Sequence, residues 1–120
     1  MNYKPRAYIA FNTTINNGSE INLETFYNNT KTGDEKISDS TVSGSVGFKN
    51  IIFWYDADVK VKTNAVSESH NDFITFKKVN NQITQNSISF CKEVVFRNDS
   101  GSTLALSIYA IPNKSNKIIN

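Results

Sequence analysis

Asp58-Val59-Lys60-Val61-Lys62 alternates charged and apolar side chains, residue by residue. In an extended strand successive side chains point to opposite faces, so the two valines would share one buried face. Similar runs recur along the chain, separated by Asn, Asp, Gly and Ser, with almost no helical period between them. We therefore predict an all-β protein, an antiparallel β-sandwich of jelly-roll or immunoglobulin-like type with about eight or nine strands.

Short turn sequences between these runs predict three hairpins. In each, turn residues separate two alternating runs: Asn17-Gly18 between 8–15 and 20–28, Asn80-Asn81 between 73–79 and 83–90, and Asp99-Ser100-Gly101 between 92–98 and 103–111. Asn and Gly tolerate the positive φ angles that tight turns require. Each predicted hairpin would place two consecutive strands side by side in one sheet.

The other predicted strands cover 41–49, 51–55 and 59–66, with polar loops at 29–40 and 67–71. A chain of 120 residues has the size of one domain. We expect residues 1–120 to form a single β-sandwich, with a flexible N-terminal arm at 1–6 and a flexible tail at 113–120.

The composition excludes several classes of protein. Thirteen basic and eleven acidic residues give a net charge of +2, too balanced to indicate nucleic-acid binding. Cys91 is the single cysteine and His70 the single histidine, which rules out an internal disulfide and a structural zinc site. We expect no cofactor.

The chain shows no secretion or membrane signal. Residues 1–6 lack the apolar core of a signal peptide, and the longest apolar run, Ile51 to Tyr55, is far shorter than a membrane span. We expect a cytoplasmic or virion location and no membrane partner.

Two groupings of acidic or nucleophilic residues are candidate sites of chemistry. The segment 67–72 holds Ser, Glu, His and Asp, but neighbours in an extended chain face opposite ways, so it is interpreted as a turn. Asp56 and Asp58 would share a strand face and are interpreted as turn and solubility residues rather than a glycosidase pair. Both are weak candidates for calcium, as are Asp34, Glu35 and Asp39, but we expect neither a metal site nor an enzyme.

Three consecutive aromatic residues, Phe53-Trp54-Tyr55, cannot all face one core. Either Trp54 is inside with Ile52, or Phe53 and Tyr55 are inside with Ile51. The apolar strand 51–55 is therefore central and covered on both sides, or its outer face meets a partner. An exposed aromatic platform would bind a protein or a sugar ring.

The stretch Val94-Val95-Phe96-Arg97-Asn98-Asp99-Ser100-Gly101-Ser102-Thr103-Leu104-Ala105-Leu106-Ser107-Ile108-Tyr109-Ala110 resembles the closing hairpin of small β-sandwich accessory proteins of bacteriophage particles. Capsid decoration and head or tail subunits have this pattern. The resemblance implies a structural subunit that has no catalytic activity and is present in many copies per particle. It assigns a binding role to no residue of this chain.

We therefore expect a non-enzymatic subunit of a larger assembly, such as a phage virion accessory protein, that forms a homo-oligomer or co-assembles with other virion proteins. The interface candidates are Lys4, Arg6, Ile52, Trp54, Tyr55, Tyr109 and Lys114. The alternative is a lectin-like carbohydrate binder that stacks a sugar on Trp54 or Tyr55.

Overall fold

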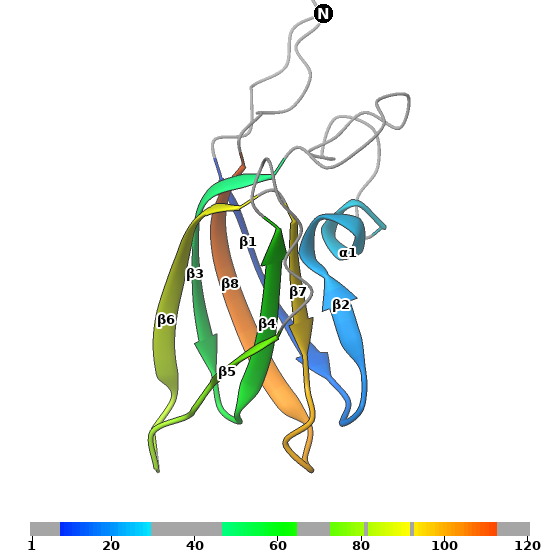
Figure 1. The fold of residues 1–120 in the computed structure, drawn as a ribbon, viewed down its shortest axis with the longest axis vertical. Coiled ribbons are helices and arrows are strands. Elements are labelled where there is room, and N and C mark those ends of the chain that lie inside the picture. Colours follow the sequence, from blue (N-terminus) through cyan, green and yellow to red (C-terminus); the bar gives the residue numbers. More distant parts are fainter. Residues whose placement is uncertain (1–7, 30–46, 65–72, 81, 92, 113–120) are drawn as a thin grey trace, which may run out of the picture.

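The computed structural model describes residues 8–29, 47–64, 73–80, 82–91 and 93–112. Eight strands and one short helix make up this part of the chain (Figure 1). Their bounds are β1 Ile9–Ile15, β2 Glu20–Asn22, α1 Leu23–Asn29, β3 Phe48–Tyr55, β4 Val59–Asn64, β5 Ile74–Phe76, β6 Thr84–Cys91, β7 Glu93–Arg97 and β8 Leu104–Pro112.

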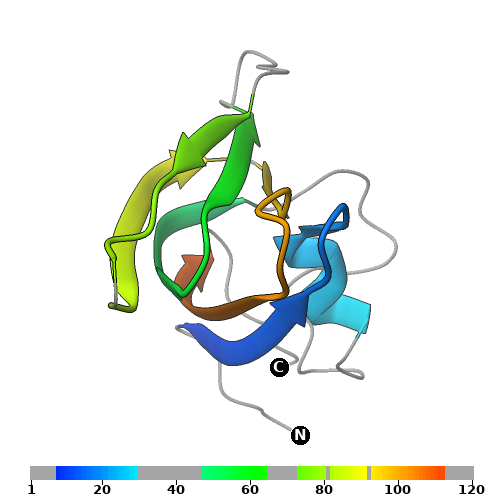
Figure 2. The ribbon, with the colours of Figure 1, turned by 90° about the horizontal axis from the view of Figure 1, so that it is seen from below.

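The strands form two four-stranded antiparallel sheets. The first, called here sheet A, has the order β1-β8-β3-β6, and the second, sheet B, has the order β2-β7-β4-β5. The pairs β1·β8, β2·β7, β3·β6 and β4·β5 are those of one long hairpin rolled into two layers, which is a jelly roll. Figure 2 shows the two sheets curving around a shared interior. The predicted β-sandwich is confirmed, and the strand order is the jelly-roll alternative.

The three predicted hairpins are wrong. Each of the three turns joins a strand of sheet A to a strand of sheet B, so β1 and β2, β5 and β6, and β7 and β8 do not pair. Short turns rich in Asn and Gly serve both a hairpin and a connection that crosses between sheets. At the first turn Gly18, with φ of 83°, donates its amide to the carbonyl oxygen of Asn98, 2.6 Å away on the β7–β8 connection. The turn is thus tied to another crossing connection and not to its own return strand.

The predicted strand at 20–28 is wrong after its third residue, because Leu23–Asn29 forms α1. The Asn22 side chain starts the helix by accepting a hydrogen bond from the Thr25 amide at 3.2 Å, as an N-cap residue does. Leu23 and Tyr27, four residues apart, are buried on one helical face, whereas Thr25 is exposed. The helix lies beside β1 and β2 (Figure 2).

The apolar run 51–55 belongs to a longer strand, β3, that lies between β8 and β6. It is therefore central within sheet A. Its inward face is buried, whereas Ile52 and Trp54 on its outward face are only half-buried, so the predicted alternative of a strand covered on both sides is not confirmed. The pairing of β3 with β8 is irregular between Phe48 and Asn50. The predicted strand at 59–66 is confirmed as β4 within the described residues, while positions 41–46 of the predicted strand 41–49 lie outside them.

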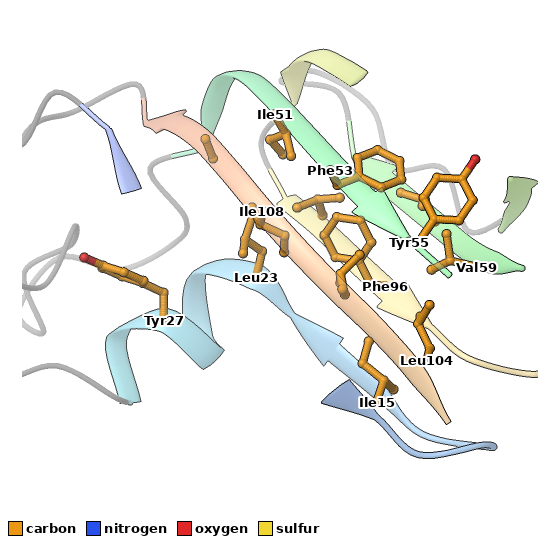
Figure 3. Close-up of a cluster of buried hydrophobic side chains, with 14 of the residues drawn as sticks. Ile15, Leu23, Tyr27, Ile51, Phe53, Tyr55, Val59, Phe96, Leu104 and Ile108 are labelled. Carbon is orange, nitrogen blue, oxygen red and sulfur yellow. The ribbon is translucent and has the colours of Figure 1, made fainter. Parts of the chain in front are cut away.

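The core is a cluster of apolar side chains from both sheets (Figure 3). The Phe53 ring lies 5.2 Å from that of Phe96 and 5.4 Å from that of Phe76, both edge to face, so one residue of sheet A contacts two rings of sheet B. The inner face of β8 is buried as predicted by its alternation: Leu104, Leu106, Ile108 and Ala110.

Candidate interaction surface

The outer face of sheet A, called here the A face, carries no charged side chain along its regular strand register. Alternating exposure and the strand register define its members: Ala10, Asn12 and Thr14 on β1; Ala105, Ser107, Tyr109 and Ile111 on β8; Asn50, Ile52 and Trp54 on β3; Gln85, Ser87 and Ser89 on β6. Two charged residues border this face: Lys49 stands at the irregular end of β3, where the alternation breaks, and Asp56 follows the other end of β3 and accepts from the Ala105 amide. The A face is thus made of apolar, hydroxyl and amide groups.

Aromatic and apolar side chains gather in the middle of the A face. The Tyr8 and Tyr109 rings are stacked, with centroids 5.1 Å apart and planes 18° apart. Tyr109 pairs across the strands with Ala10 on one side and Ile52 on the other. Tyr8 is 50% exposed and Tyr109 36%, large values for apolar rings that contact each other.

The outer face of sheet B is charged. Arg97 on β7 contacts Glu20 on β2 at 3.0 Å and Asp99 at 2.9 Å, and Lys60 on β4 contacts Asp99 at 3.3 Å. The hydrogen bond from Arg97, followed by that from Lys60, holds the pKa of Asp99 below its ordinary value against the opposing effect of desolvation. The same bond to Asp99, and then the bond to Glu20, raises the pKa of Arg97. The two outer faces of the sandwich therefore differ in chemistry.

The structure brings three of the predicted interface residues to the A face and removes a fourth. Ile52 and Trp54 are half-buried there, and Tyr109 is more exposed. Tyr55 is wrong as a surface residue, because it has no exposed area and points into the core with Phe53. Between the two arrangements of the aromatic run, the structure has Phe53 and Tyr55 inside. Lys4, Arg6 and Lys114 lie outside the described residues.

The Tyr55 hydroxyl has an internal role. It donates to the carbonyl oxygen of Lys77 at 3.2 Å and accepts from the Asn86 amide at 2.7 Å. A buried phenol needs such partners, and here they connect β3 to β6 and to the β5–β6 connection. The Tyr55 side chain therefore stabilises the fold and is not exposed to bind a ligand.

The two carboxylates considered for calcium hold backbone amides. Asp56 accepts from the Ala105 amide at 2.8 Å, and Asp58 accepts from the Lys78 amide at 2.9 Å while its second oxygen lies 3.6 Å from the Lys77 ammonium. Within the described ranges no three His, Cys, Asp or Glu side chains are grouped as metal ligands. The candidates at 34, 35 and 39, and the segment 67–72 with His70, lie outside the described residues.

Sequence reasoning missed Tyr8 and the small polar members of the A face. A signal was present, since the segments that became β1, β6 and β8 contain no Lys, Arg, Asp or Glu. Outward positions of a solvated strand usually carry such residues. Their absence from three strands of one sheet becomes visible only when the strand order is known.

Comparisons with other proteins place few limits on function. No protein-family model and no curated protein matches the chain. A solved chain from work on disulfide-linked pili that form endospore appendages of Bacillus is similar over 93% of this chain and 94% of its own, at 8% identity and a TM-score of 0.32. A likeness of this size does not assign a function. Among the described residues, the structure has no helix with the length and apolarity to cross a membrane.

Proposed function

We propose that this protein is a non-enzymatic subunit of a protein assembly and that the A face is its contact surface. The observation that carries the proposal is the uncharged A face with its stacked Tyr8 and Tyr109 rings. Tyr and Trp are enriched at protein interfaces, whereas Lys, Glu and Asp are depleted there. The charged outer face of sheet B serves as an internal comparison, because it has the composition of a solvated surface.

The chemistry of the A face favours a second copy of the chain as the partner. A surface without charge loses little on desolvation when it meets another uncharged surface, whereas a charged partner would bury unpaired ions against it. This chain itself presents such a surface. Two copies related by a two-fold axis would bring the two A faces together.

The resemblance of residues 94–110 to phage accessory proteins suggests a virion as the assembly. In the structure this segment joins β7 of sheet B to β8 of sheet A and is not a hairpin. The virion role is therefore proposed from the sequence pattern alone, while the assembly role is proposed from the A face.

Sedimentation velocity over a range of protein concentrations tests the assembly role. We expect the unmodified chain to self-associate as the concentration rises, and Tyr109→Glu to weaken this association by placing a carboxylate in the middle of the A face. Thr75→Glu, an exposed position on the outer face of sheet B, is the matched control and should associate like the unmodified chain. Equal association of Tyr109→Glu and the control would contradict the proposal.

A carbohydrate-binding role is the second candidate, favoured by one observation. The exposed Tyr8–Tyr109 stack lies in a sheet face whose other members include the amide of Asn12 and the hydroxyl of Ser107. Aromatic rings flanked by amides and hydroxyls suit a sugar ring. A glycan array probed with the unmodified chain and with Tyr109→Ala separates the two: specific binding lost in the variant would favour this role over assembly.

A further inference from the structure

Strand β6 is a sheet edge that no feature of the described residues protects. Proteins usually protect an edge strand by making it very short, by placing charged residues or Pro in it, or by adding a bulge. The eight residues of β6, Thr84 to Cys91, include no charged residue, no Pro and no Gly, and their register with β3 runs without a bulge. Within the described part of the chain β6 pairs with β3 alone, and Figure 1 shows it at the margin of the molecule.

The other three edges differ from β6. The two edges of sheet B, β2 and β5, are only three residues long each. The second edge of sheet A, β1, is tied to other parts of the fold: the Asn98 side chain donates to the carbonyl oxygen of Ile15 at 2.8 Å, and the Phe11 ring contacts rings of α1. Among the four edges in the described part of the chain, β6 alone combines length, a regular register and the lack of a protective feature.

We propose that β6 pairs antiparallel with β6 of a second copy, so that the two A sheets join into one continuous sheet. A two-fold axis perpendicular to the sheet reverses the strand direction and therefore produces an antiparallel pair. The contact closes on itself because each copy contributes the same edge. Exposed main-chain groups of the edge would supply the hydrogen bonds, as in other cases of strand addition.

The lack of charge in β6 favours β6 of a second copy as the strand that pairs with this edge. Near a two-fold axis a side chain faces itself or a close neighbour from the other copy, so a charged residue near the middle of β6 would meet a like charge. In a register centred on Ser87, Ser87 faces Ser87 and Gln85 faces Ser89, so these outward side chains can hydrogen-bond across the pair. A strand selected to pair with a different, charged edge would not need to be neutral throughout. The inference goes beyond the proposed function, since it gives second copies a contact through the edge of sheet A that is separate from contact through the A face.

Charge reversal at Ser87 tests the pairing. Ser87 is exposed and lies near the middle of β6, so Ser87→Lys and Ser87→Glu should each fold. We expect each variant alone to self-associate about tenfold more weakly than the unmodified chain in sedimentation velocity, because like charges would face each other. An equimolar mixture of the two variants should recover the association. Thr75→Lys on sheet B is the control and should behave as the unmodified chain.

Amide hydrogen exchange separates edge pairing from contact through the A face. Ser87 points toward the A face as well, so a face-to-face dimer could also respond to the charge reversal. Edge pairing alone gives new acceptors to outward-pointing amides of β6, so these amides should exchange more slowly as the protein concentration rises, with little change in β8. No such slowing in β6, or no recovery in the mixture, would overturn the inference. If the β6 pairing fails these tests but Tyr109→Glu still weakens association, the proposed function stands without the β6 pairing. A chain that is monomeric at every concentration would overturn both the β6 pairing and the proposed function.

Discussion

Asn98 shows how one buried amide fastens an end of the sandwich. Its side chain is fully buried and donates to the carbonyl oxygens of Ile15 at 2.8 Å and Ser102 at 2.7 Å. Its side-chain oxygen accepts from the amide and the hydroxyl of Ser100, at 2.9 and 2.7 Å. Its backbone also bonds to Gly18 and Ser19. One residue thus joins the β1–β2 connection to the β7–β8 connection.

Replacing Asn98 should therefore be costly. Asn98→Ala would leave the carbonyl oxygen of Ile15 buried without this donor, and we expect a loss of about 2–4 kcal/mol in the free energy of unfolding. Urea denaturation followed by Trp54 fluorescence measures it. Asn17→Ala is the matched control, since Asn17 accepts one exposed hydrogen bond from the Gly101 amide and should cost about 1 kcal/mol. Similar losses in the two variants would refute the proposed role of Asn98.

The ion pairs around Asp99 predict how stability depends on pH. Because the pKa of Asp99 is lowered in the folded state, its contribution is fully present above the unfolded value of about 3.9 and is lost as the pH falls through the lower folded pKa. Arg97, whose pKa is raised, stays charged throughout this window. We expect Asp99→Asn to lose less stability than the unmodified chain between about pH 5 and pH 2. The urea midpoints of the unmodified chain and of Asp99→Asn at both pH values measure this difference. An equal loss of stability in the two proteins would show that Asp99 makes no such contribution.

At the scale of elements, the chain changes from strand to helix at Asn22. The run 20–28 alternates well enough to predict a strand, yet only Glu20–Asn22 pairs with β7. The competing signal is an N-cap residue followed by Leu23 and Tyr27 at helical spacing. Packing decides between the two periods, since the helix buries both residues and brings the rings of Phe26 and Tyr27 to Phe11.

The N-cap of α1 gives a test at this scale. Asn22→Ala removes the acceptor for the Thr25 amide and should destabilise the protein by about 1 kcal/mol, because a helix of seven residues has few other bonds to hold its first turn. Asn22→Asp keeps an acceptor oxygen and should stay within a few tenths of a kcal/mol of the unmodified chain. Thermal or urea unfolding measures both. A loss of the same size in Asn22→Asp would attribute the effect to the β2–β7 pairing instead of the cap.

At the scale of the whole molecule, the sequence predicted which residues face inward far better than which strands are neighbours. The burial of Ile9 and Ile15 on β1 and of the inner face of β8 followed directly from alternation of period two. Strand order did not follow, because a turn such as Asn17-Gly18 fits a hairpin and a sheet-to-sheet connection equally. The A face was only partly predictable for the same reason: Ile52, Trp54 and Tyr109 were expected at an interface, but their neighbours come from strands far apart in the sequence.

The pairing of β1 with β8 has a consequence for synthesis on the ribosome. Ile9 pairs with Ala110 and Ile15 with Leu104, so the first strand finds its neighbour only after β8 has been translated. Closing so long a loop is slow, and folds dominated by distant pairings take milliseconds to seconds. Until then the edge of β3 that pairs with β8 is also without its neighbour, and unpaired strand edges of this kind are prone to aggregation.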